Sequence, residues 1–310
     1  MVPLEQGPSW NSAKVEQAFA GAGASVRRVD RLRVEVEGRR WFEVRSPDTT
    51  SVALQTCRDK TATAAALRAA GLAVPEQVRC RPRDAPDVAA RMGWPVCVKP
   101  VSGSQGYAVT PQVTSRNLLV WAVARASGRG RRPVVVERSV VGTHWRVLVI
   151  GTAVSLVECR PWRMVGDGRT PIDEMVAREN TRRRTSLTQP FLIKLDEGLV
   201  RTLAEQSLRP MSVPSRGRVV ELSWSRNVHQ GAEPVERGEG APERVRVAAE
   251  AAVAAVDGLA HAAVDLVDDG ATCWVVDVNS NPGLASHLHP YEGEPRPVLE
   301  PLVARYFQVA

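Results

Sequence analysis

Residues 262–290, AAVDLVDDGATCWVVDVNSNPGLASHLHP, are the stretch of the sequence that decides the fold. Two apolar runs, AAVDLV and CWVVDVN, are separated by the turn-forming residues Asp268, Asp269 and Gly270. Short runs of this kind on either side of such a turn are typical of an antiparallel hairpin. The sequence therefore predicts two paired strands whose side chains can be assigned to faces.

The polar residues of this hairpin fall on one of its faces, because side chains alternate along a strand. In the second strand Asp277 and Asn279 share a face, while Val276 and Val278 fill the other. Asp265 points away from its apolar neighbours in the first strand. Carboxylate and amide oxygens held together suit magnesium. The spacing predicts a magnesium site of Asp265, Asp277 and Asn279, and acidic residues on the solvent-exposed face of a hairpin remain the alternative.

The segment that follows, DVNSNPGLASHLHPYEGEPRP, resembles the last motif of the ATP-grasp ligases. It is most similar to the ATP-grasp half of cyanophycin synthetase. The resemblance implies an α+β fold of the ATP-grasp type, in which two lobes clamp ATP, behind a small N-terminal subdomain. It also places Asp265, Asp277 and Asn279 on the magnesium ligands of the family. Most relatives carry Glu where this chain has Asp277, so the shorter side chain is a departure from the family pattern.

Composition excludes several other classes of protein. The net charge of +7 is spread along the chain, with small clusters only at residues 129–132 and 182–184, so no nucleic-acid partner is expected. No long uncharged apolar run is present, so no membrane partner is expected either. The five cysteines are scattered and never form a C-x-x-C pair, which favours a reduced, cytoplasmic protein.

Lysine is rare in this arginine-rich chain, and it occurs only at Lys14, Lys60, Lys99 and Lys194. Two of these residues stand where the family binds ATP. The resemblance assigns Lys60, which follows an aspartate near a helix start, to the ATP phosphates. Lys99, at the end of a strand over residues 94–100, matches the second phosphate-binding lysine of the family. The flexible glycine-rich loop that follows supplies the further candidates Ser102, Gly103, Ser104 and Gly106.

Further nucleotide-binding candidates follow from the same resemblance. The strand over residues 134–137 leads into the adenine-recognising hinge, which here comprises Glu137, Arg138, Ser139 and Val140. Arg146 matches the family arginine and is the candidate for the transferring phosphoryl group. His144 stands where relatives place a carboxylate for the ribose hydroxyls; a neutral imidazole accepts only one such hydrogen bond. Asn227 matches an asparagine of the family.

Three consecutive segments are expected: an N-terminal subdomain (residues 1–56), an N-lobe with the glycine-rich loop (57–140) and a C-lobe with the metal site (141–310). Hydrophobic periodicity and turn residues predict helices over residues 12–22, 58–71 and 243–257, and near 171–180 and 194–208. They predict strands over residues 34–37, 41–44, 147–150, 153–157 and 218–222.

The function implied by the resemblance is ATP-dependent ligation of a carboxylate to an amine through an acyl phosphate, with release of ADP and phosphate. Lys99 and Arg146 are the catalytic candidates, and ATP and Mg²⁺ are the cofactors. The expected partners are a small-molecule carboxylate and amine, an amino acid or short peptide, and a homodimer is left open. Two alternatives also stay open: a degenerate ATP-binding regulatory subunit, and a phosphotransferase.

Overall fold

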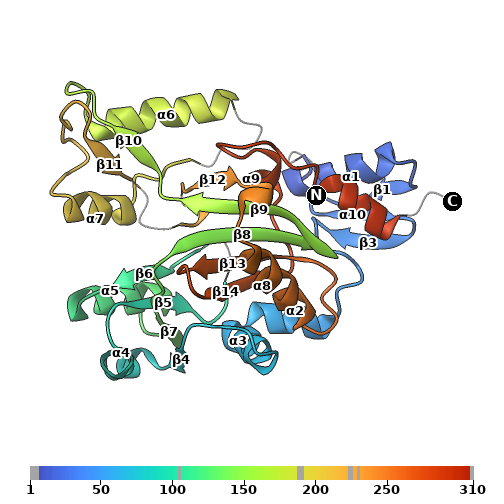
Figure 1. Cartoon of the computed structure of the whole chain (residues 1–310), viewed down its shortest axis with the longest axis horizontal. Coiled ribbons are helices and arrows are strands. Elements are labelled where there is room, and N and C mark those ends of the chain that lie inside the picture. The colour runs from blue at the N-terminus through green and yellow to red at the C-terminus, as the bar shows by residue number, and fades with distance from the viewer. Residues whose placement is uncertain (1–6, 104–105, 187–191, 223–225, 229–230, 308–310) are drawn as a thin grey trace, which may run out of the picture. The chain divides into compact units, whose positions relative to one another are not determined.

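The computed structural model describes residues 7–103, 106–186, 192–222, 226–228 and 231–307 (Figure 1). The chain forms two compact units. Unit 1 comprises Met1–Pro75, Val140–Val157 and Glu236–Ala310, and unit 2 comprises Glu76–Ser139 and Glu158–Val235. Both units are therefore built from separate stretches of chain. The division into three consecutive domains stays a prediction, since the two units are defined by compactness alone.

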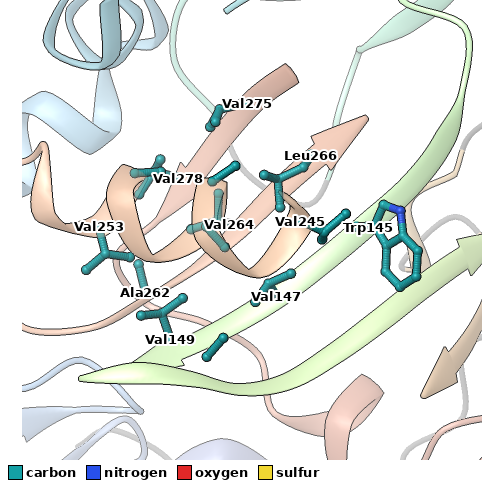
Figure 2. Close-up of a cluster of buried hydrophobic side chains, with 14 of the residues drawn as sticks. Trp145, Val147, Val149, Val245, Val253, Ala262, Val264, Leu266, Val275 and Val278 are labelled. Carbon is teal, nitrogen blue, oxygen red and sulfur yellow. The ribbon is translucent and has the colours of Figure 1, made fainter. Parts of the chain in front are cut away.

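The central sheet of unit 1 has five strands in the order β12-β9-β8-β13-β14. The predicted hairpin is confirmed as β13 (Ala262–Asp268) and β14 (Cys273–Asn279), which pair antiparallel. β13 also pairs antiparallel with β8 (Thr143–Ile150), so it lies in the middle of a three-strand arrangement. The helix α8 (Glu243–Ala254) crosses one face of these strands (Figure 2).

The face beneath α8 is the larger apolar core of unit 1 (Figure 2). Alternate residues of the strands point into it, including Val147, Val149, Val264 and Leu266, and all four are buried. Burial of each such side chain contributes about 1.5–3 kcal/mol. Because these residues alternate with Arg146 and Asp265, the same packing forces the charged side chains onto the opposite face.

One prediction for the hairpin was wrong. The register shifts between Asp265 and Leu266, which pair with Asp277 and Val275 respectively, so Val276 is an extra residue in β14. This β-bulge interrupts the two-residue alternation. Val275 and Val278 are buried, whereas Val276 is only half-buried. The bulge leaves Asp277 directly opposite Asp265, and directly paired residues project from the same face of a sheet.

The other face of the central sheet is covered at one end by the N-terminal subdomain. This subdomain contains the helix α1 (Trp10–Gly21) and the strands β1 (Val26–Arg28), β2 (Arg33–Val36) and β3 (Arg39–Phe42). Its Phe19 and Trp41 share a core with Leu148, Ile150 and Ala263 of the central sheet. The C-terminal helix α10 (Leu299–Tyr306) packs against α1, although the two lie at opposite ends of the chain (Figure 1).

The helix predicted over residues 58–71 corresponds to α3 (Lys60–Ala69), and a further helix that was not predicted, α2 (Ser51–Arg58), lies directly before it. The break falls at Asp59, whose carboxylate accepts hydrogen bonds from the backbone N–H groups of Thr61 (2.8 Å) and Ala62 (3.2 Å). An aspartate at this position satisfies donors that have no partner inside the helix. The cap places Lys60 at the first position of α3.

Unit 2 has a four-stranded sheet with the order β4-β7-β5-β6. Its elements are β4 (Gln77–Cys80), α4 (Ala85–Met92), β5 (Val96–Pro100), β6 (Thr110–Val113), α5 (Arg116–Ala126) and β7 (Val134–Arg138). A second group of elements has its own core and comprises β10 (Arg163–Val165), α6 (Ile172–Ser186), α7 (Glu197–Glu205) and β11 (Val219–Glu221). None of the helices described is long and apolar enough to cross a membrane.

Candidate active site

Four charged side chains of unit 1 form a row across three neighbouring strands and a helix start. On β8, Arg146 donates from Nη1 to Oδ1 of Asp265 on β13 at 2.8 Å. Asp265 in turn lies opposite Asp277 on β14. At the end of the row, Nζ of Lys60 lies 3.5 Å from Oδ1 of Asp277. The structure therefore brings together four predicted site residues that lie far apart in the sequence.

The two cations of this row are more deeply buried than the two carboxylates. The side chains of Arg146 and Lys60 are 8% and 11% exposed, while those of Asp265 and Asp277 are 30% and 33% exposed. Burial raises the pKa of Asp265, the charge of Arg146 lowers it in part, and the neighbouring charge of Asp277 raises it further. A further cation placed beside Asp265 would favour the charged form of its carboxyl group and lower its pKa.

The donor set of Asp265, Asp277 and Asn279 fits a magnesium ion, because all three side chains offer oxygen ligands. Asp265 and Asp277 supply carboxylate oxygens that are side by side, and Asn279 follows on the same face of β14. Within the described residues, no group of three His, Cys, Asp or Glu side chains could hold a metal. Asn279 stays the predicted third ligand, through its amide oxygen, and an all-oxygen set of this kind suits Mg²⁺.

Asn281 connects this predicted metal site to the N-terminal subdomain, and sequence reasoning missed it. Its Oδ1 accepts from the backbone N–H groups of Val44 (3.3 Å) and Arg45 (3.1 Å), and its Nδ2 donates to Glu43 at 2.8 Å. Its own backbone N–H donates to Oδ1 of Asn279 at 3.0 Å. Asn281 thus fixes the side chain of Asn279 and holds the loop after β14 against residues more than two hundred positions earlier.

A second polar cluster, also missed from the sequence, lies beside the row. Ser155 on β9 (Thr152–Arg160) donates its hydroxyl hydrogen to the carboxylate of Glu236 on β12 (Glu233–Glu236). The same Ser155 oxygen lies 2.6 Å from Nδ1 of His287 in α9 (Ala285–Leu288). All three side chains are buried. We refer to Glu236, Ser155 and His287 as the buried relay.

The segment over residues 292–296 encloses the buried relay. The backbone N–H of Glu236 donates to the carbonyl of Glu292 at 2.9 Å, and that of Arg296 donates to the carbonyl of His287 at 3.1 Å. A Cβ at Gly293 would lie 2.3 Å from the carbonyl oxygen of Glu236, so only glycine allows this approach. The HLHP and EGEPRP runs were the sequence signal for this cluster, although neither run reveals Ser155 or Glu236.

In unit 2 the second predicted lysine forms a buried ion pair. Nζ of Lys99 on β5 lies 2.5 Å from Oε2 of Glu137 on β7, and both residues are 5% exposed. The predicted hinge begins inside a strand, since Glu137 and Arg138 are the last residues of β7 and only Ser139 and Val140 follow it. The backbone N–H of Ser139 donates to the carbonyl of Pro95 at 3.1 Å.

The glycine-rich loop is partly described. Ser102 and Gly103 are exposed, and Ser104 lies outside the described residues. Gly106 has a φ of +67°, and a Cβ there would lie 3.0 Å from Nδ2 of Asn227. Two predicted residues that are far apart in the sequence, Gly106 and Asn227, are therefore brought into close contact within unit 2.

These features agree with the comparisons with known proteins. No family model matches the chain. It is 30% identical over 228 residues to a cyanophycin synthetase of Crocosphaera subtropica, covering 69% of this chain and 26% of that protein. A cyanophycin synthetase of Trichormus variabilis is 29% identical over 298 residues, covering 88% and 32%. A bifunctional glutathione synthetase from Pasteurella multocida has the same fold, with a TM-score of 0.62 at 22% identity over 93% of this chain and 43% of that one.

The chain belongs to the ATP-grasp superfamily. The predicted α+β fold of the ATP-grasp type is confirmed. Enzymes of this superfamily use ATP. The chain spans about a quarter to a third of the length of the cyanophycin synthetases it matches, since it covers 26% and 32% of the two described above.

The position of His144 is the clearest departure from the ATP-grasp pattern. His144 lies on β8 two residues before Arg146, so both side chains project from the same face of the central sheet. Its partner in the register is Val267 of β13, and the side chain is half-buried. The imidazole therefore lies on the face that carries the charged row. Its contact with the ribose of ATP stays a prediction.

Proposed function

We propose that this chain is an ATP-dependent carboxylate–amine ligase that forms an amide bond and releases ADP and phosphate. The observation that carries the proposal is the charged row, in which Arg146 and Lys60 are held beside the carboxylates of Asp265 and Asp277. Cations fixed in this way are already oriented for anionic phosphoryl oxygens, and such preorganised groups stabilise developing charge strongly. The relationship to cyanophycin synthetases and to glutathione-forming enzymes supports the same class of reaction.

The reaction has two steps in this proposal. A carboxylate oxygen of the first substrate attacks the γ-phosphorus of ATP, and ADP leaves with the electrons of the broken P–O bond. The amine nitrogen of the second substrate then attacks the carbonyl carbon of the acyl phosphate. Phosphate leaves with the electrons of the C–O bond, and the nitrogen loses one proton to water. The products are an amide, ADP and phosphate.

The residues of unit 1 have separate roles in this scheme. Asp265, Asp277 and Asn279 hold magnesium, which when bound neutralises charge on the phosphates. Arg146 binds the transferring phosphoryl group and the oxyanion that follows, and Lys60 binds phosphate oxygens beside Asp277. In unit 2, Lys99 and the loop of Ser102, Gly103, Ser104 and Gly106 are the phosphate-binding candidates. The remaining nucleotide-binding candidates of unit 2 are Glu137, Arg138, Ser139 and Asn227. Those of unit 1 are Val140 and His144.

Amino acids and short peptides are the proposed substrates, as the names of the cyanophycin- and glutathione-forming relatives suggest. Three further points stay predictions: the chain has no nucleic-acid or membrane partner, it forms a homodimer, and it is cytoplasmic. The departures at His144 and Asp277 bear on affinity for ATP and metal rather than on the type of reaction.

The test is a screen of amino acids and dipeptides for amine-dependent release of ADP, followed by identification of the products. With the correct acid and hydroxylamine in place of the amine, the acyl phosphate should be trapped as a hydroxamate. Arg146→Lys should lower the rate about 100-fold or more, because one ammonium cannot replace a two-pronged guanidinium. Arg178→Met is the matched control, since Arg178 is an exposed residue of α6 that forms an ion pair with Glu174 of the same helix. Release of AMP and pyrophosphate would contradict the proposal, and a phosphorylated product that no amine consumes would favour a phosphotransferase.

A further inference from the structure

The hydrogen-bonding pattern of the buried relay determines the protonation of His287. Glu236 accepts at Oε1 from the backbone N–H groups of Leu156 (3.1 Å) and Gly238 (3.0 Å), and at Oε2 from the hydroxyl of Ser155. The single hydrogen of Ser155 is thus used on Glu236. The oxygen of Ser155 can only accept in its contact with Nδ1 of His287, at 2.6 Å, so the imidazole carries its hydrogen on Nδ1.

The other nitrogen of His287, Nε2, therefore carries no hydrogen and can accept a hydrogen bond through its lone pair. Nε2 is buried and has no hydrogen-bond partner among the residues that the structure describes. A buried acceptor without a donor costs about 1–3 kcal/mol, so its persistence in a well-packed site calls for a donor that arrives in another state of the protein. Burial and the charge of Arg146 lower the pKa of His287 to about 3, which keeps this imidazole neutral at any working pH.

Arg146 is the donor that the structure places on the same side of the sheet. Arg146 alternates with Val147 on β8 and so shares a face with Leu148 and Ile150, two residues further along at each step. That face packs against Leu284, which precedes α9, and Leu288, its last residue, and His287 lies between the two in the sequence. β8 and β9 are neighbours in the sheet, and Ser155 on β9 holds the imidazole.

We infer that His287 is a positioning residue for Arg146, whose guanidinium moves from Asp265 to Nε2 of His287 when a cation takes the Asp265 carboxylate. The inference rests on the proposed function, because it assumes that Asp265 binds magnesium. A guanidinium has five N–H donors, so one edge can bind Nε2 while another remains directed at a phosphoryl oxygen. A neutral imidazole, unlike a carboxylate, orients the guanidinium without neutralising its positive charge. Arg146 would therefore keep its full charge for the phosphoryl group.

The first test needs neither substrate nor activity. Asp265→Asn removes the negative partner of Arg146 and imitates its release by a metal. In ¹⁵N NMR spectra of imidazole-labelled protein, wild type should show His287 with Nδ1 protonated and Nε2 unprotonated. Asp265→Asn should move the Nε2 signal upfield, as a new hydrogen bond requires. Asp269→Asn, in the exposed turn of the same hairpin, is the matched control and should leave the signal in place.

The second test separates positioning from a purely structural role. His287→Asn keeps a polar atom near Ser155 and deletes Nε2, so it should lower kcat about 10- to 100-fold with little change in the KM for ATP. An unmoved Nε2 signal in Asp265→Asn overturns the inference, and so does a signal that moves only when the amine substrate is added. The NMR result stands even if every substrate screen fails, so failure of the inference and failure of the proposed ligase activity are distinguishable.

Discussion

The ion pair of Lys99 and Glu137 allows a sharp test, because a catalytic role and a structural role predict different results. The two side chains are 6% and 7% exposed and their charged atoms are 2.5 Å apart. Replacing Lys99 alone by Met leaves the carboxylate of Glu137 buried and unpaired. Loss of one partner of a buried pair destabilises a protein by about 3–5 kcal/mol. For a unit of this size that corresponds to a fall in Tm of about 6–20 °C.

Thermal and urea unfolding of Lys99→Met and of the double variant Lys99→Met/Glu137→Leu measure this effect. Two apolar side chains of similar volume can replace a buried pair at little net loss, so the double variant should recover most of the stability. If Lys99 also binds phosphate, the double variant should remain inactive at a temperature where it is fully folded. An unchanged Tm in Lys99→Met would refute the burial argument. Recovery of activity together with stability would show that Lys99 only supports the fold.

Three further predictions concern unit 1. Asp277→Asn should abolish magnesium-dependent turnover while the circular dichroism spectrum stays unchanged, and Asp277→Glu should lower the magnesium concentration that half-saturates the rate; near-normal turnover of the Asn variant would remove Asp277 from the metal site. Burial lowers the pKa of His261 to about 4, although the hydrogen bond to the Val44 carbonyl raises the pKa in part. Neutral His261 therefore stabilises the fold fully above pH 6.5, and this stabilisation is lost as the pH falls towards 4. The expected loss is about 3 kcal/mol, and the unfolding free energy of His261→Phe should depend correspondingly less on pH over that range. If His144 binds the ribose, His144→Glu should preserve or lower the KM for ATP, because a carboxylate accepts two hydroxyl hydrogen bonds, and a large rise would contradict that position.

Alternation along a strand made the central hairpin predictable from the sequence. Val264 and Leu266 flank Asp265 with apolar side chains, which only a strand with one buried face explains. The bulge at Val276 was not predictable, because a single valine is equally compatible with a paired or an extra position. The predicted helix start at residue 58 was two residues too early, since Arg58 ends α2 and Asp59 is the cap of α3.

The buried relay was outside the reach of sequence reasoning. Ser155 is 81 residues from Glu236 and 132 residues from His287, and neither Ser155 nor Glu236 lies in a recognisable motif. Their chemistry depends on burial, and residues 292–296 contact Glu236 and His287 through backbone hydrogen bonds. The same holds for Asn281, whose partners lie in the turn after β3. Spacing identifies residues that share an element, whereas these clusters depend on which elements become neighbours.

The charged row explains how unit 1 can hold buried cations before any ligand binds. Two cations, Lys60 and Arg146, face two carboxylates, Asp277 and Asp265, so the row has no net charge. An unpaired charge at this depth would destabilise the fold by several kcal/mol. When a divalent cation takes the carboxylates, the metal and the two carboxylates are again neutral, and the two positive side chains are left for the phosphate oxygens. In the proposed reaction the negative phosphate oxygens then offset the two positive side chains, which are in place beforehand because the carboxylates stabilise them.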